Sequence, residues 1–148
     1  MDLFNNQQPI PYNKNDDVVI LTIDDFKIVK DKRGSKLMLT KNKLDKRGVL
    51  KAYAFWCPHC VRRYDTFRNL ATTLKQDFTV YVCDVAAIKP QTKLQERKHE
   101  LLNKMVKYYP TMLLVSSRGN ITKANFGADE DEVLEGINEH YGKVKNVN

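Results

Sequence analysis

Hydrophobic residues along the chain follow two spacings, one typical of strands and one typical of helices. Apolar, β-branched runs at 18–23, 49–55 and 78–85 predict strands. Between the second and third runs, apolar residues recur at helical spacing and predict one amphipathic helix over 58–76. A strand, a helix and a strand in this order predict a parallel strand pair joined by a helical crossover.

The second half of the chain continues this alternation, and the first half carries an addition. Helical spacing at 92–108 and at 129–141 predicts two further helices. Apolar runs at 112–115 and 121–126, separated by a turn, predict an antiparallel strand pair. Alternating residues at 26–40 predict an extra hairpin. The expected fold class is therefore α/β, with a central mixed β-sheet flanked by helices and an extra N-terminal hairpin.

The length of the chain, 148 residues, fits one compact domain. Polar residues and prolines predict a flexible leader over 1–16, followed by the domain over 17–142 and a short tail over 143–148. No apolar run is long enough to cross a bilayer, so we expect no membrane span. The N-terminus lacks the basic start and apolar stretch of a secretory signal, which predicts a cytoplasmic location.

The charge of the chain is unevenly distributed. Its formal net charge is +7, with basic residues crowded in 27–51 and 89–107 and acidic residues in 129–135. A solvated, lysine-rich surface is the favoured explanation; acidic proteins or anionic membranes are alternatives. We do not expect nucleic acid as a partner.

The three cysteines are too few for a disulfide scaffold, and two of them are close together. Cys57 falls where a strand is predicted to end and a helix to begin. A thiolate there faces unpaired backbone N–H groups, which lowers the pKa of the thiol. Pro58 fits the first helical position, and Cys60 lies three residues after Cys57 on the same face, within disulfide range.

These positions predict a division of labour in thiol–disulfide exchange. Cys57 is the expected exposed nucleophile that forms a mixed disulfide with a protein, and Cys60 is the more buried cysteine that resolves it. His59 either stabilises the Cys57 thiolate or is an ordinary loop residue, and both interpretations are open. Trp56 is expected to cover one side of the sulfurs or to anchor the helix, and the two roles are compatible.

The chain resembles thioredoxins over about residues 18–141. The residues that carry the resemblance are Phe55-Trp56-Cys57-Pro58-His59-Cys60, Tyr109-Pro110-Thr111-Met112-Leu113-Leu114-Val115, Arg118-Gly119-Asn120 and Phe126-Gly127.

The resemblance implies protein thiol–disulfide oxidoreductase activity, without a cofactor. Its implied partners are proteins with disulfides or dithiols and an upstream reductase or oxidant. It also implies that Pro110 is a cis proline packed against the active-site disulfide; spacing alone predicts only a trans proline that ends a helix. Tyr109 would lie beside the sulfurs and pair with an extended substrate, and Gly127 would border the same groove.

Three departures from the family affect these expectations. Lys51 stands where thioredoxins carry a buried acid, and we expect its long side chain to reach the surface. The Pro58-His59 dipeptide resembles that of oxidising disulfide donors and leaves the direction of the reaction open. The segment 88–108 is longer and more basic than in a minimal thioredoxin.

Other chemistries have less support. A zinc site needs four ligands, but the chain has one CxxC pair and no second pair at suitable spacing, so we expect no metal. Glutathione-dependent activity lacks its usual tyrosine in the motif. Cys83 lies in a predicted strand and is expected to be an inert core thiol. The main alternative is a redox-inactive thioredoxin-fold module with a basic binding surface.

Overall fold

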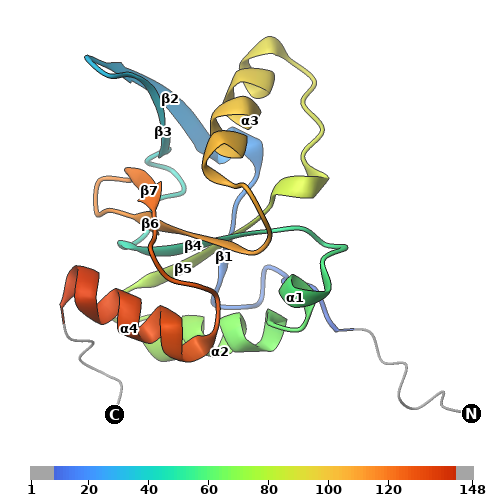
Figure 1. Cartoon of the computed structure of the whole chain (residues 1–148), viewed down its shortest axis with the longest axis vertical. Coiled ribbons are helices and arrows are strands. Elements are labelled where there is room, and N and C mark those ends of the chain that lie inside the picture. Colours follow the sequence, from blue (N-terminus) through green and yellow to red (C-terminus); the bar gives the residue numbers. More distant parts are fainter. Residues whose placement is uncertain (1–8, 143–148) are drawn as a thin grey trace, which may run out of the picture.

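The fold was analysed in a computed structural model, which describes residues 9–142. A five-stranded sheet forms its centre, in the order β1-β5-β4-β6-β7 (Figure 1). The strands are β1 (Val19–Ile20), β4 (Gly48–Tyr53), β5 (Thr79–Asp84), β6 (Thr111–Val115) and β7 (Ile121–Lys123). β5 is parallel to β1 and β4, whereas β6 is antiparallel to β4 and β7. The predicted α/β class and mixed sheet are confirmed.

One face of this sheet is covered by α1 (Pro58–Val61), α2 (Tyr64–Leu74) and α4 (Glu130–Tyr141) (Figure 1). These helices carry their buried side chains on the side toward the sheet, where they form one core with alternate residues of the strands. The N-terminus of α1 lies at the end of β4, so the sheet and this helix together position the CxxC motif.

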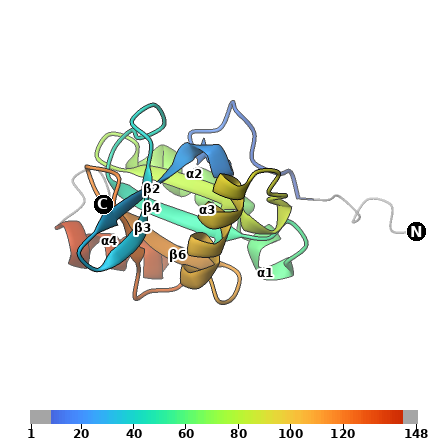
Figure 2. The same ribbon diagram turned by 90° about the horizontal axis from the view of Figure 1, so that it is seen from above.

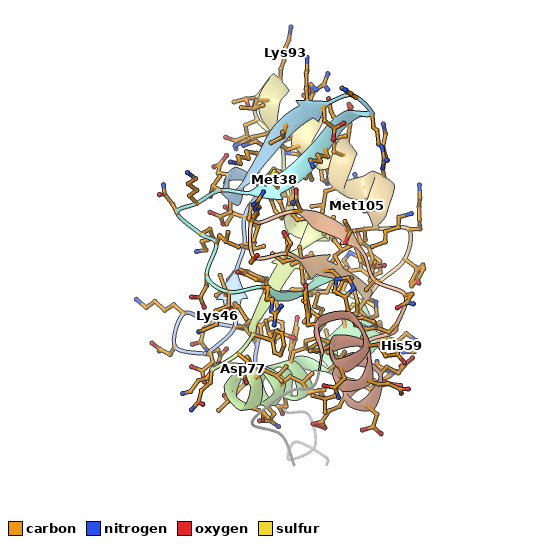
Figure 3. The ribbon with its side chains drawn as sticks, turned by 90° about the vertical axis from the view of Figure 1, so that its left-hand side faces the viewer. Met38, Lys46, His59, Asp77, Lys93 and Met105 are labelled. Atoms are coloured by element: carbon orange, nitrogen blue, oxygen red, sulfur yellow. The ribbon has the colours of Figure 1, made fainter. Side chains whose placement is uncertain are left out.

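The opposite face is covered by α3 (Lys93–Met105) and by the hairpin of β2 (Phe26–Asp31) and β3 (Gly34–Leu39) (Figures 1 and 2). The predicted extra hairpin is therefore confirmed. It forms its own two-stranded sheet, which packs against α3. Figure 3 places Lys93 at one end of the long axis, far from His59 of the motif. None of the helices within residues 9–142 is long and apolar enough to span a membrane.

The central strand β4 is buried along its whole length and supplies both cores. Leu50 and Ala52 face the α3 side, whereas Val49 and Tyr53 face the α2 side. Side chains alternate across a strand, so Lys51 also points toward α2, beneath the motif. This register explains why a lysine reaches the interior of the molecule.

The single helix predicted over 58–76 is wrong, because the chain forms two helices with a break at Arg62 and Arg63. The carbonyl of Cys60 accepts a bond from the Nζ atom of Lys51 at 3.0 Å and a tight-turn bond from the backbone N–H of Arg63 at 3.1 Å. A side chain that takes a helical carbonyl in this way interrupts the regular ladder of the helix.

Two expectations near the N-terminus also differ from the structure. The strand predicted over 18–23 is only two residues long, because Thr22 and Asp25 form a capping box that begins a short 3₁₀ turn, Ile23–Asp25. Within the predicted leader, residues 1–8 lie outside the described part, but Tyr12 is buried in the core. The polar composition of this segment predicted a flexible leader, but the aromatic ring of Tyr12 is enough to bury its end against the core.

Candidate active site

The motif occupies the junction of β4 and α1. Cys57 is the N-cap residue of α1 and Pro58 is its first helical residue, as the sequence predicts. Cys60 is fully buried, and Cys57 retains only 6% of its surface, less than expected for an exposed nucleophile. The thiol of Cys57 donates to the carbonyl oxygen of Tyr109 at 3.6 Å, which shields one side of the sulfur.

The pKa values of the two thiols are shifted in opposite directions. Burial alone would raise the pKa of Cys57, but hydrogen bonds from the Cys60 thiol and from the backbone N–H groups of Cys60 and His59 outweigh it, and the pKa is lowered. Burial raises the pKa of Cys60 to about 12. Near neutral pH, Cys57 is thus the thiol prepared to react as a thiolate, while Cys60 keeps its proton.

Two aromatic residues lie next to the motif: Trp56 precedes Cys57 in the chain, and the carbonyl oxygen of Tyr109 contacts the Cys57 sulfur. The rings of Trp56 and Tyr109 meet edge to face, with centroids 5.7 Å apart. Trp56 stays 61% exposed, so its ring is available for contact with another molecule. The peptide bond between Tyr109 and Pro110 is cis. The structure therefore brings together Cys57, Trp56, Tyr109 and Pro110 from two distant parts of the sequence.

The backbone N–H of His59 faces Cys57, whereas its ring lies against Arg62. The Nδ1 atom of its imidazole lies 2.7 Å from a guanidinium nitrogen of Arg62, at the margin of the molecule (Figure 3). Its carbonyl accepts a bond from Arg63, which also binds Asp129 at the start of α4 at 2.6 Å. Arg63 thereby ties the motif helix to the C-terminal helix.

Lys51 is fully buried, and the expectation that it reaches the surface is wrong. The Nζ atom contacts the hydroxyl of Tyr12 at 2.7 Å and the carbonyl of Cys60 at 3.0 Å. Burial lowers the pKa of Lys51 to about 7, and the nearby thiol of Cys60 partly opposes this effect. The lysine is held inside because its strand position faces the core and its polar end finds two partners there.

A comparison with protein families identifies the chain. The family model described as thioredoxin matches residues 35–139, which is most of its length. The chain belongs to the thioredoxin family.

One curated relative shows how the chain compares with a longer protein. A protein disulfide-isomerase of Zea mays is 24% identical over 135 residues, which are 90% of this chain and 22% of the maize protein. The chain therefore spans about a fifth of that relative.

Solved structures show the same fold. The exposed lipoprotein thioredoxin of Streptococcus pneumoniae strain TIGR4 is 19% identical, with a TM-score of 0.50, over 77% of this chain and 98% of that one. ERdj5 is 16% identical, with a TM-score of 0.51, over 86% of this chain and 18% of that one.

Two residues considered in the sequence analysis lie outside the motif. Gly127 precedes α4, and a Cβ atom at this position would meet the carboxylate of Glu132. Its place along the substrate groove stays a prediction. Cys83 is 1% exposed in the opposite core, and burial raises its pKa to about 12, as befits an inert thiol. Within residues 9–142, no group of three or more His, Cys, Asp and Glu side chains is arranged to hold a metal ion.

The aromatic side chains around Lys51 were not expected from the sequence. Tyr12, Tyr53, Tyr64 and Phe67 surround its Nζ atom, with ring centroids 4.7–5.2 Å away. The alternation of Val49, Lys51 and Tyr53 in a buried strand was a signal that could have revealed the lysine. No comparable signal marks Tyr12, because its burial depends on residues far along the chain.

Proposed function

We propose that this thioredoxin-family protein is a protein thiol–disulfide oxidoreductase in which Cys57 is the nucleophile and Cys60 the resolving residue. The observation that carries the proposal is the geometry of the pair: Cys57 is the N-cap residue of α1 beside the carbonyl of Tyr109, and Cys60 is fully buried three residues later. This geometry lowers the pKa of Cys57 and raises that of Cys60 to about 12. One thiol is ready to attack a disulfide, while its neighbour stays protonated until the mixed disulfide has formed.

The exchange is balanced in two steps. The Cys57 thiolate attacks a disulfide of the substrate, the substrate S–S bond breaks, and a substrate thiolate leaves and takes a proton. Cys60 then loses its proton and attacks the sulfur of Cys57, which forms the Cys57–Cys60 disulfide and releases the second substrate thiolate. Two electrons pass from the protein to the substrate, and a dithiol reductant restores the thiols. The reverse sequence oxidises a substrate dithiol.

Substrate binding is assigned to the aromatic border of the motif. Trp56 offers an exposed apolar ring, and the backbone around Tyr109 and Pro110 lies next to the reactive sulfur. An extended polypeptide carrying a disulfide fits such a border better than a small thiol does. Proteins with disulfides or dithiols are the proposed substrates; the upstream redox partner and the cytoplasmic location stay predictions of the sequence.

Reduction of insulin by dithiothreitol tests this proposal. We expect the wild-type protein to accelerate the reaction and Cys57→Ser to abolish the acceleration, while Cys83→Ser, a cysteine of the opposite core, behaves like the wild type. Equal rates for the wild type and Cys57→Ser would contradict the enzymatic function and leave the redox-inactive binding module. The equilibrium of the protein with glutathione then gives the direction in which the couple operates.

A further inference from the structure

Lys51 is a buried amine whose hydrogen-bond partners are uncharged. Its Nζ atom lies 2.7 Å from the hydroxyl of Tyr12 and 3.0 Å from the carbonyl of Cys60, and its side chain has no exposed surface. A buried cation with neutral partners forfeits most of its hydration, so its charged form is costly. The surroundings of Lys51 thus decide whether it carries a charge.

The aromatic rings around Lys51 offset part of this cost. Ring faces attract an ammonium group, and the nearest ring, that of Phe67, has its centroid 4.7 Å from Nζ. Burial lowers the pKa of Lys51 to about 7 against the opposing effect of the Cys60 thiol, so both charge states are populated near neutral pH. Titratable and charged groups face Lys51 from each element packed against it. They are the ring residues Tyr12, Tyr53 and Tyr64, the motif cysteines Cys57 and Cys60, and the α2 arginines Arg63 (its N-cap) and Arg68.

Tyr12 is suited to both charge states of Lys51. A phenol hydroxyl both donates and accepts hydrogen bonds. The ammonium form of Lys51 donates to the phenol oxygen, and the neutral amine accepts the phenol O–H. Burial raises the pKa of Tyr12, so the phenol keeps its proton. The carbonyl of Cys60 can only accept, so Tyr12 is the partner that satisfies Lys51 in either state.

Tyr12 is held in place by α2. The guanidinium of Arg68 donates to the carbonyl oxygens of Ile10 and Pro11 and bonds the carboxylate of Asp16 at 3.1 Å. It also lies 5.3 Å from the centroid of the Tyr12 ring. These contacts fix the residues on both sides of Tyr12, so its hydroxyl is directed at Lys51 by several independent bonds.

We propose that Tyr12 is a positioning residue that keeps Lys51 beneath Cys60 able to gain and lose a proton as the Cys57–Cys60 disulfide opens and closes. The inference rests on the proposed function. A substrate dithiol supplies two electrons and two protons. The electrons break the disulfide bond, one proton goes to Cys60, and the other goes to Lys51, which leaves Cys57 as a thiolate balanced by an ammonium.

The sign of the coupling follows from the charges. An ammonium beneath the motif stabilises the thiolate, and the thiolate in turn stabilises the ammonium. The charged state of Lys51 therefore favours the reduced protein and makes the disulfide a stronger oxidant. Loss of the charge has the opposite effect.

The direct test is an NMR titration of lysine labelled with ¹³C at Cε, in the reduced and the oxidised wild-type protein. The Lys51 resonance is assigned by its absence in Lys51→Met. We expect its midpoint to lie near neutral pH in the reduced protein and about one pH unit lower in the oxidised protein. Equal midpoints in the two forms, or a midpoint in the ordinary lysine range, would overturn the inference. The experiment does not depend on the folding of any variant apart from the assignment.

A double-mutant cycle tests the role of Tyr12. We expect Lys51→Met to shift the glutathione equilibrium about threefold to tenfold toward the disulfide, and Tyr12→Phe to shift it less in the same direction. In the Lys51→Met background, Tyr12→Phe should have no further effect. An equal effect of Tyr12→Phe in both backgrounds, or none in the wild type, would contradict a role exerted through Lys51.

The matched control is Tyr141→Phe. Its hydroxyl donates to the carbonyl oxygens of Gly48 and Val115, which lie 2.9 Å and 2.8 Å away, at the opposite end of β4 from the motif. Loss of this hydroxyl removes a comparable buried bond, so it reveals any effect of lower stability on the equilibrium. Activity toward insulin without any coupling refutes this inference alone; coupling without activity refutes the proposed function alone.

Discussion

The two faces of the central sheet are equally well buried but contain different chemistry. Toward α3 and the hairpin, the core consists mainly of aliphatic residues around Cys83. Toward α2, the core contains the motif cysteines, several tyrosines and the buried Lys51. The α3 face is an ordinary apolar protein interior, whereas the α2 face buries polar groups beneath the N-terminus of α1.

The difference shows that burial by itself does not make a cysteine reactive. Burial raises the pKa of both Cys60 and Cys83 to about 12. Cys60 differs because Cys57 lies three residues before it at the start of α1, and because the Nζ atom of Lys51 bonds its carbonyl. Under the proposed function, position relative to a second thiol and a buried lysine, rather than solvent exposure, makes Cys60 part of a redox pair and leaves Cys83 a core thiol.

The largest expected effect comes from replacing the buried cysteine on the reactive face, Cys60. We expect Cys60→Ser to lower turnover of a disulfide substrate by a hundredfold or more, on the order of other losses of an essential reacting group. The mixed disulfide with Cys57 should accumulate, because no thiol resolves it. Mass spectrometry of the quenched reaction measures this species.

Cys83→Ser is the matched change on the other face. Its turnover should stay at the wild-type level, although a buried hydroxyl costs about 1–3 kcal/mol of stability where it lacks a partner. If Cys83→Ser also lost turnover in protein that is still folded, the functional contrast between the faces would be wrong.

A second prediction concerns the aliphatic face. Leu113 has no exposed surface and lies on the α3 side of β6. Leu113→Ala should lower the free energy of unfolding by about 2–5 kcal/mol through lost burial and the resulting cavity. Urea unfolding measures the loss, and the rate per folded molecule should not change. A lower rate at full folding would show that this face also supports the chemistry.

A third prediction is a core substitution that raises the stability instead of lowering it. Lys51 has a pKa of about 7 in the folded protein against an ordinary lysine pKa of 10.5, so between these pH values the unfolded chain binds more protons. The stability of the wild type therefore rises with pH across this window. The cost of burying Lys51 is greatest below pH 7. Lys51→Met removes this cost and should stabilise the reduced protein by about 1–3 kcal/mol at pH 6.

The gain should decrease as the pH rises toward 9, because the lysine of the wild type is then neutral when folded. Urea unfolding at pH 6, 7.5 and 9 checks the trend. Lys123→Met, the same change at an exposed position of β7, is the control and should show no such pH dependence. A gain independent of pH would mean that Lys51 stays charged in the core.

The order of elements and the motif could be predicted because their signals are local. The change from strand to helical spacing after Phe55 placed Cys57 at a helix start, and Pro58 suited the first helical position. The break between α1 and α2, at Arg62 and Arg63, could not be predicted in this way. It depends on the Nζ atom of Lys51, which approaches Cys60 from the neighbouring strand.

The position of Tyr12 was beyond sequence analysis for a related reason. Its segment is polar, and bonds from Arg68, far along the chain, to the carbonyls of Ile10 and Pro11 hold it against the core. The burial of Lys51 was more accessible, since Val49 and Tyr53 on either side of it share its face of the strand. Contacts between distant segments, rather than local patterns, determine the polar half of the site.

The smallest expected effect tests how the reactive face stabilises its thiolate. The backbone N–H of His59 lowers the pKa of Cys57, whereas the imidazole is paired with Arg62. His59→Ala keeps that N–H, so the alkylation rate of Cys57 by iodoacetamide at pH 7 should change less than about twofold, a difference of under 0.5 kcal/mol. The pH profile of alkylation gives the thiolate titration directly. A drop of tenfold would show that the imidazole itself stabilises the thiolate, and the contrast between the two faces would then depend on a side chain at the surface as well as on the helix end and Lys51.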